Sequence, residues 1–148
     1  MAETEEFGKS LSFACDRGEC EDAQIISAAL GREIAERFGP ADAAPLSLRA
    51  YEGERLTGGL NGLIHWRWLY IRHFWIDTRW RGRGLGRQLL AQAEAEMTAR
   101  DGAGIYLDTF DAGAAAFYER CGFIRCGEIA NFPPGFSRVF LRKGLAAG

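Results

Sequence analysis

The chain has 148 residues, of which 47% are hydrophobic and 26% charged, and its formal net charge is −2. This length and balance indicate a globular protein that can bury a core without disulfides or metal, and they exclude a protein whose whole surface attracts nucleic acid. No run approaches about 18 apolar residues, and the acidic start MAETEEFGKS lacks the apolar segment of a secretory signal, so we expect a cytoplasmic protein. We expect one domain over residues 1–148, with a flexible N-terminus over residues 1–9.

The first predicted elements are a short strand at residues 11–15 and a helix at residues 21–38. Apolar side chains recur through the second segment at roughly helical spacing, from Ile25 to Phe38. Gly39 and the proline that follows it are a stop signal for this helix.

Three strands are predicted next, at residues 46–51, 55–66 and 68–77. The tripeptide at residues 52–54 has a central glycine and indicates a hairpin turn between the first two strands. Several glycines in the second strand indicate a bulge or bend. The third strand, WLYIRHFWID, is rich in the aromatic and β-branched residues that favour strands.

Helices and strands alternate in the second half of the chain. We expect an amphipathic helix at residues 85–100, a strand at 105–110 and a short helix at 112–121. A last pair of strands, at residues 123–129 and 138–142, flanks the loop NFPPGFS. The order β-α-β-β-β-α-β-α-β-β predicts an α/β (α+β) protein with a mixed, mostly antiparallel sheet.

The cysteines do not indicate a metal site. They form two pairs with the spacing C-x4-C, which is not a usual zinc spacing, and the chain has only 2 histidines. We therefore expect no metal, and free, partly buried thiols in a reducing compartment.

The turn RWRGRGLGRQLL, residues 79–90, concentrates arginine and glycine between a strand and a helix. Glycines let a backbone approach a phosphate closely, and the free N–H groups at a helix N-terminus attract an anion. A dinucleotide-binding G-x-G-x-x-G pattern fails because Arg87 stands at its last glycine, and a Walker loop fails because it needs a lysine. The pattern that fits is R-x-x-G-x-G, formed by Arg81, Gly84 and Gly86.

This pattern resembles the coenzyme A pyrophosphate motif of the GNAT superfamily of N-acetyltransferases. A second segment, DAGAAAFYERCGF at residues 111–123, is similar to the N-x-x-A-x-x-x-Y-x-x-x-G-F segment of that family, with Asp111 where asparagine is usual. The resemblance covers about residues 46–143. The stretches WIDTRWRGRGLG, YLDTF and FPPGFSRVFLRK also resemble a bacterial subgroup whose substrates are generally unassigned.

The resemblance implies a single GNAT-like domain with helices on both faces of the sheet and a splay between the fourth and fifth strands. It implies acetyl-CoA as the acetyl donor, with the pyrophosphate at the glycine turn and the pantetheine amides at the ends of the splayed strands. The residues expected to bind the cofactor are Phe74, Trp75, Ile76, Arg81, Gly82, Arg83, Gly84, Leu85, Gly86, Arg87, Asp111 and Ala114.

Tyr118 stands at the family's general-acid position. A phenol with an ordinary pKa near 10 is protonated at neutral pH and can donate to the leaving sulfur. For the general base, the sequence leaves open Asp108, which shares a strand face with Tyr106, a weaker candidate in His73, and a chain of water molecules.

The acceptor site is expected near the strand before the turn. Regular alternation would place Tyr70, Arg72, Phe74 and Ile76 on one face of that strand and would turn His73 toward a packed helix. The residues expected to contact the acceptor are Tyr70, Arg72 and Phe136. Arg72 would suit an acceptor that carries a carboxylate.

The function implied by the resemblance is transfer of an acetyl group to a primary amine by direct attack in a ternary complex. A non-catalytic acyl-CoA-binding or sensing module is the alternative, and a nucleotide-binding protein that uses the glycine turn is a third hypothesis. The partner is expected to be a small-molecule or peptide amine, with no nucleic acid and no membrane, and exposed strand edges are compatible with a homodimer. The sequence does not identify the acceptor or the length of the acyl group.

Overall fold

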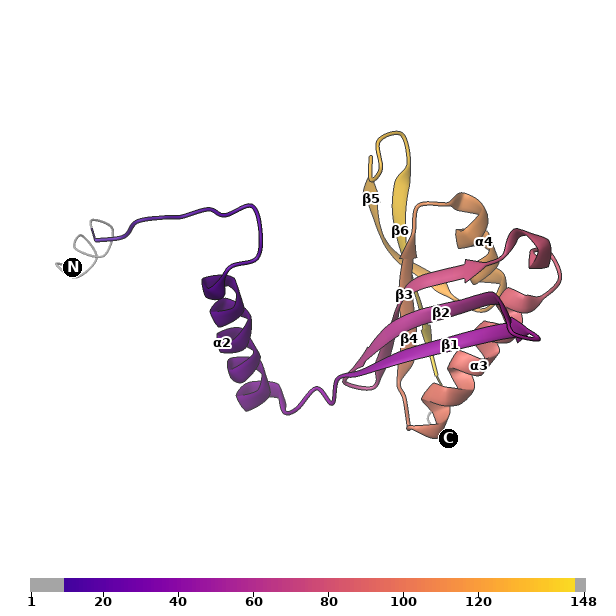
Figure 1. The fold of residues 1–148 in the computed structure, drawn as a ribbon, viewed down its shortest axis with the longest axis horizontal. Helices are drawn as coiled ribbons and strands as arrows, with labels where there is room; N and C mark the ends of the chain where they lie inside the picture. Colours follow the sequence, from indigo (N-terminus) through magenta and orange to yellow (C-terminus); the bar gives the residue numbers. More distant parts are fainter. Residues whose placement is uncertain (1–9, 146–148) are drawn as a thin grey trace. The chain divides into compact units, whose positions relative to one another are not determined.

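The computed structural model describes residues 10–145 and divides the chain into two compact units, residues 1–40 and 41–148 (Figure 1). The predicted flexible segment at residues 1–9 lies outside the described residues. Among the residues described, no helix is both long enough and apolar enough to cross a membrane.

Among residues 10–40, the described part of the first unit, there is one helix, α2 (Glu21–Phe38), which has the predicted bounds. Gly39 ends it with a φ of 84°, and its N–H donates to the carbonyl of Ala35 at 3.0 Å. The prediction of a strand at residues 11–15 is wrong, because these residues are exposed and belong to no strand. A short strand gains most of its stability from a neighbour, so its own residue pattern was insufficient evidence.

The second unit is built on a six-stranded sheet in the order β1-β2-β3-β4-β6-β5. All neighbours are antiparallel except β3 and β4, which are parallel, so the predicted mixed, mostly antiparallel sheet is confirmed. The strands are β1 (Ala44–Glu52), β2 (Arg55–His65), β3 (Trp68–Ile76), β4 (Gly104–Thr109), β5 (Ile124–Ala130) and β6 (Ser137–Gly144). The connecting helices are a short 3-10 helix (Thr78–Trp80), α3 (Leu85–Ala99) and α4 (Ala112–Arg120).

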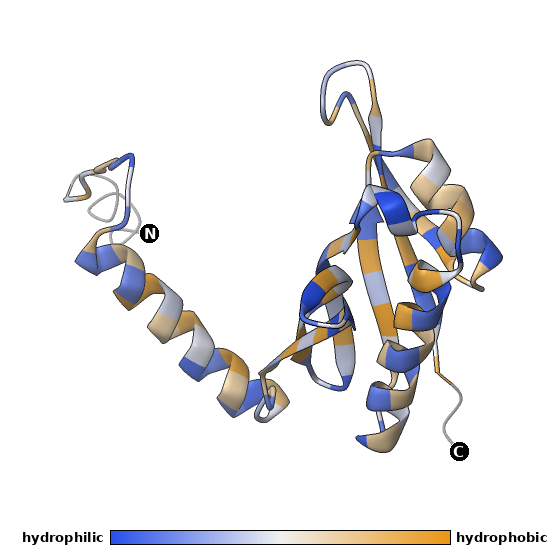
Figure 2. Cartoon of the chain, turned by 45° about the vertical axis from the view of Figure 1, so that its right-hand side comes forward, coloured by the Kyte–Doolittle hydropathy of each residue, from blue (hydrophilic) through white to orange (hydrophobic). Residues whose placement is uncertain are grey.

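The core of this unit lies between one face of the sheet and the helices α3 and α4 (Figure 1). Apolar and polar side chains alternate along the strands and around α3, as the bands of colour in Figure 2 show. Alternation places one set of each strand on the helix-covered face. The side chains that are almost completely buried are Leu60, Leu69, Met97, Ile105, Leu107 and Leu141.

A bulge in β3 changes which side chains face this core. Ile71 pairs with Gly62 and His73 with Asn61, so Arg72 is an extra residue without a partner in β2. Tyr70 therefore lies on the face away from α3, whereas Phe74 packs against the core. The predicted common face for Tyr70, Arg72 and Phe74 is wrong, and so is the prediction that His73 faces a helix, because His73 is exposed.

The two parallel strands separate after the bulge. They pair from Trp68 with Gly104 to Ile71 with Leu107, and no pair follows. The predicted splay therefore lies between β3 and β4, which become the third and fourth strands because residues 11–15 form none. The splay leaves the backbone at the end of β3 without a partner in β4, beside the turn that leads to α3.

Candidate active site

The turn between β3 and α3 presents a row of backbone donors. Gly82 and Gly84 have φ of 71° and 85°, the left-handed region that glycine adopts without strain. Gly84 is the N-cap of α3, so the N–H groups of the first helical turn have no partner inside the helix. The N–H groups of residues 82–84 also donate to no backbone carbonyl in the turns and loops of residues 10–145. With the positive end of the helix dipole, this geometry suits a phosphate.

Arginines surround the turn in ordered positions. The Nε of Arg81 donates to the carbonyl oxygen of Ile76 at 3.0 Å, which ties the turn to the splayed end of β3. The guanidinium of Arg83 lies 4.2 Å from the centre of the Trp80 ring. Arg81 therefore lines the same cavity as the glycines of the turn.

A first cavity of about 540 Å³ runs from the turn to α4. It joins the splayed end of β3, the start of α3 and one side of α4, and it contains every predicted cofactor-binding residue except Arg83. Its lining is Phe74, Trp75, Ile76, Trp80, Arg81, Gly82, Gly84, Leu85, Gly86, Arg87, Asp111, Ala114, Phe117, Tyr118 and Arg120.

Sequence reasoning missed three residues of this lining: Trp80, Phe117 and Arg120. Helical spacing could have identified Phe117 and Arg120, since they follow Ala114 at intervals of three and share its side of α4. Gly86 is also explained by this neighbourhood, because a Cβ there would lie 3.2 Å from the Phe117 ring. The glycine thus lets the start of α3 approach α4 closely.

Tyr118 is a buried residue in the lining of the first cavity. Its ring meets the Phe74 ring edge-on, with centroids 6.1 Å apart, and packs beside Phe117 and Phe123. Burial raises the pKa of Tyr118 to about 12, and nearby Cys121 and Asp111 add to the effect. The hydroxyl therefore keeps its proton throughout the neutral range and is available as a donor.

Asp111 caps α4 rather than reaching freely into the cavity. Its Oδ1 accepts hydrogen bonds from the N–H groups of Gly113 at 2.8 Å and Ala114 at 3.1 Å. An aspartate is among the best N-cap residues, so this interaction accounts for the residue type.

Asp108 lies on the other face of the sheet, since it alternates in β4 with the buried Leu107. The Tyr70 hydroxyl donates to its Oδ1 at 2.6 Å, and Arg138 donates to its Oδ2 at 3.1 Å. The hydrogen bond to Asp108, together with burial, raises the pKa of Tyr70 to about 12. The Tyr70 ring also stacks on Tyr106 with centroids 4.8 Å apart.

Arg138 was missed by the sequence analysis. Its guanidinium lies 4.0 Å from the centre of the Phe132 ring and 5.3 Å from that of Phe110. The Nε of Arg138 is buried without a hydrogen-bond partner in the described part of the chain. The aromatic rings and the ion pair hold this arginine against Asp108, with side chains 25% and 12% exposed.

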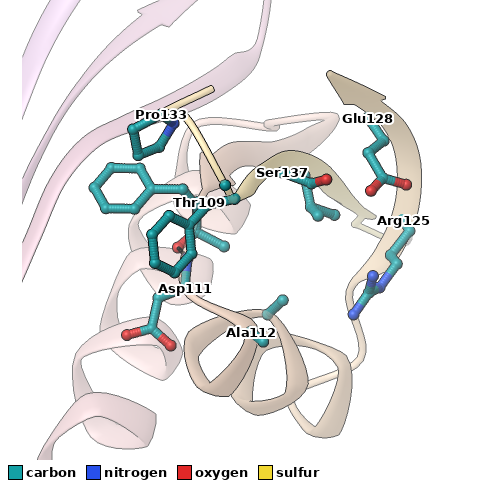
Figure 3. Close-up of a pocket in the computed structure, with 12 residues that line it drawn as sticks. Thr109, Asp111, Ala112, Arg125, Glu128, Pro133 and Ser137 are labelled. Atoms are coloured by element: carbon teal, nitrogen blue, oxygen red, sulfur yellow. Dashed lines mark hydrogen bonds between the residues drawn. The ribbon is translucent and has the colours of Figure 1, made fainter. Parts of the chain in front are cut away.

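A second cavity, of about 650 Å³, lies on the opposite side of α4 from the first and shares Asp111 with it. Figure 3 shows Asp111 and Ala112 on one side of this cavity and Arg125 and Glu128 on the other. Its complete lining is Thr109, Phe110, Asp111, Ala112, Ala115, Arg125, Glu128, Pro133, Gly135, Phe136, Ser137 and Val139.

The residues predicted for acceptor binding are not brought together. Phe136 lines the second cavity, Tyr70 bonds Asp108 on the far face, and Arg72 is exposed at the bulge. Tyr70 and Arg72 line neither of the two cavities. Among residues 10–145, no group of three or more His, Cys, Asp or Glu side chains is placed to hold a metal ion.

Comparisons with known proteins give a consistent result. Residues 14–123 match the model of the Acetyltransferase (GNAT) family. Blasticidin-S acetyltransferase from Streptomyces morookaense is 39% identical over 109 residues, which cover 70% of this chain and 80% of that protein. Acetyltransferase Atu2258 from Agrobacterium fabrum is 35% identical over 108 residues, 72% of this chain and 79% of that protein. A crystal structure from Agrobacterium tumefaciens is similar with a TM-score of 0.82 and 31% identity, covering 91% of this chain and 100% of that one.

Proposed function

This chain belongs to the GNAT acetyltransferase family and is an N-acetyltransferase, and on that premise we propose that it moves an acetyl group from acetyl-CoA to a small-molecule amine by direct attack in a ternary complex. The observation that carries the proposal is the first cavity, whose lining includes both the turn with free N–H groups and Tyr118. An elongated cofactor with a phosphate at one end and a thioester at the other fits that arrangement.

The residues of the cavity match the parts of coenzyme A. Free N–H groups from Gly82 to Gly86 would receive the pyrophosphate, with Arg87 and Arg120 supplying further charge. The unpaired backbone at the end of β3 would bond the pantetheine amides across the splay. Acetyl-CoA would supply the activated acetyl thioester.

In the proposed reaction, a bond forms between the amine nitrogen and the acetyl carbon, and the bond from that carbon to sulfur breaks. Tyr118 gives its hydroxyl proton to the departing sulfur, since a phenol is protonated at neutral pH. The proton from the amine passes to Asp108 directly or through water, because Asp108 borders the splay from the other face. Tyr70 and Arg138 orient that carboxylate.

We place the acceptor beside the loop of residues 131–136. Phe132 in this loop packs on Arg138, which holds Asp108, and Phe136 lines the second cavity. The similarity to an enzyme named for blasticidin S favours a small-molecule amine over a protein acceptor. Aromatic side chains near a carboxylate suit an acceptor that is flat or cationic around its amine.

The alternative raised by the sequence, a non-catalytic acyl-CoA-binding module, conflicts with the membership of this chain in an acetyltransferase family. One observation nevertheless favours it: both oxygens of Asp108 already accept hydrogen bonds, from Tyr70 and Arg138. Turnover separates the two candidates. An enzyme releases CoA thiol when a broad set of amines is supplied, whereas a sensing module binds acetyl-CoA and releases none beyond the uncatalysed rate.

Binding is tested by thermal stability with acetyl-CoA, dephospho-CoA, ATP and NAD in parallel. Ligand at about 100 times its dissociation constant stabilises by roughly 2.7 kcal/mol, which gives a shift of several degrees for a chain of this size. We expect a shift with both CoA forms and none with NAD. Absence of a shift with millimolar acetyl-CoA would refute the cofactor assignment.

Catalysis is tested by Tyr118→Phe. Loss of a general acid lowers turnover by about 100-fold or more. The dissociation constant of acetyl-CoA should change by less than about threefold, since the ring and its packing remain. Equal turnover in the variant and the wild type would remove Tyr118 from the mechanism.

A further inference from the structure

β5 forms one edge of the sheet, and all of its residues, Ile124 to Ala130, are exposed. The backbone groups on the outer side of an edge strand lack partners and can accept another strand. The opposite edge, β1, contains Pro45, which removes a donor, whereas β5 contains no proline. β5 is therefore the edge that is better suited to a further strand.

A bulge interrupts the regular alternation of β5. Arg125 pairs with Leu141 and Gly127 pairs with Phe140, so Cys126 has no partner in β6. After an extra residue of this kind, each side chain lies on the other face of the sheet than regular alternation would predict.

The bulge brings chemically matching residues onto common faces. Ile124 and Ile129, which regular alternation would separate, lie on the same face and are 61% and 47% exposed. Arg125 and Glu128 lie together on the other face, where both line the second cavity (Figure 3). The segment Ile-Arg-Cys-Gly-Glu-Ile has an isoleucine at each end. The residue next to one isoleucine is a positive arginine, and the residue next to the other is a negative glutamate.

We propose that β5 pairs with β5 of a second copy of this chain, antiparallel, about a two-fold axis between Cys126 and Gly127. Such an axis runs perpendicular to the sheet and leaves each face on its own side. Ile124 then lies opposite the partner's Ile129, and Arg125 lies opposite the partner's Glu128, each twice by symmetry. A bulge usually discourages edge pairing, but here the two bulges face each other at the axis and create the match.

The pairing favours a second copy over an unrelated strand. Like charges directly opposite one another are unfavourable, and opposite charges and apolar pairs are favourable, so the register is fixed by four matching contacts. The same pairing brings the partner's Glu128 and Arg125 to the rim of the second cavity. The dimer therefore completes the charged edge of that cavity, and its test does not depend on acetyl transfer.

Charge reversal tests the register. All variants are made with Glu119→Gln, because Glu119 pairs with Arg125 inside one chain at 3.0 Å and would confound the result. By sedimentation velocity across chain concentrations, Arg125→Glu and Glu128→Arg should each raise the dimer dissociation constant by about tenfold, since each creates two like-charge pairs. The double variant should return it to within about threefold of the Glu119→Gln background. Arg100→Glu, an exposed reversal at the C-cap of α3, is the control and should leave the dimer dissociation constant unchanged.

A disulfide tests the same geometry when the dimer is weak. With Cys15, Cys20, Cys121 and Cys126 replaced by serine, Ile124→Cys combined with Ile129→Cys should form an intermolecular disulfide under mild oxidation, because directly opposite Cβ atoms are within bonding range. Ile124→Cys alone should not, since its partner position remains isoleucine.

Two results would overturn the proposal. One is a wild-type chain that stays monomeric at up to about 1 mM and whose double-cysteine variant does not cross-link. The other is a dimer that ignores both single reversals, which would place the interface elsewhere. Unchanged thermal unfolding of each variant shows that the comparison is between folded proteins.

Discussion

Replacing Tyr118 with phenylalanine also measures how strongly its hydroxyl is desolvated. Burial raises the pKa from the ordinary 10 to about 12, and the residue is only 7% exposed, so solvent screens little of the effect. At roughly 1.36 kcal/mol for each pKa unit, the difference corresponds to about 2.7 kcal/mol. Because the folded state holds this proton more tightly than the unfolded state, the stability is fully present below pH 10 and is lost as the pH rises through 12.

The assay is urea unfolding, followed by tryptophan fluorescence, at about pH 9 and about pH 12 for the wild type and Tyr118→Phe. At the lower pH the two should agree within about 1.5 kcal/mol, because the volume and packing of the ring are kept. Between the two pH values the wild type should lose about 2.3 kcal/mol more than the variant, since half of the folded molecules still hold the proton at pH 12. Equal losses would show that water reaches the hydroxyl, and they would refute the desolvation on which its role as a proton reservoir depends.

Three further substitutions test the surroundings of the site. Gly84→Ala should lower the free energy of unfolding by about 1–2 kcal/mol in urea, because its φ of 85° is left-handed while the space around a Cβ is open. Lys143→Met should lower the free energy of unfolding by about 1–2 kcal/mol, since Lys143 contacts the Glu94 carboxylate and donates to a carbonyl at the end of α4. The double variant with Glu94→Gln should lose less stability than the sum of the losses in the two single variants. Tyr70→Phe should reduce kcat/KM by about tenfold in steady-state assays without changing the acetyl-CoA dissociation constant, because Asp108 loses a hydroxyl that orients it. An equal loss of cofactor affinity would contradict this.

The local signals in the sequence were sufficient for the helices. α2 has the predicted bounds because its apolar spacing and its glycine stop are both local features. The same is true of the turn at residues 81–86, where glycine type, backbone φ and the start of α3 agree. Evidence of this kind lies within a few residues of the element it predicts, so it does not depend on the rest of the fold.

The bulge at Arg72 shows why strand faces were harder to predict. The glycines of β2 did indicate an irregularity, but the extra residue lies in the neighbouring strand. Gly62 permits it, because a Cβ there would stand 2.5 Å from the Tyr70 carbonyl oxygen. A sequence does not record which of two paired strands carries the extra residue, so Tyr70 was wrongly grouped with Phe74 on one face.

The partner of Asp108 depends on a register that joins distant segments. β4 and β6 are antiparallel, with Asp108 opposite Phe140, and this register puts Arg138 one diagonal step away. The residues Asp108 and Arg138 are 30 positions apart, and neither segment carries a local signal for the pairing. The sequence therefore identified the carboxylate as a candidate without the arginine that holds it.

The splay and strand alternation together explain why the proposed acid and base come from different sides of the sheet. Leu107 faces the cluster that contains Tyr118, and its neighbour Asp108 necessarily faces away. The gap between β3 and β4 opens directly beyond Leu107, so it is bordered by Tyr118 on one face and by Asp108 on the other. On the proposed mechanism, the cofactor and the amine then approach the gap from opposite faces, and a proton leaves the amine on one side while another reaches sulfur on the other. Because these two adjacent residues of one strand face opposite sides of the sheet, the two proton transfers take place on opposite sides of the gap. An opening in the sheet at this position is what lets the cofactor and the amine meet.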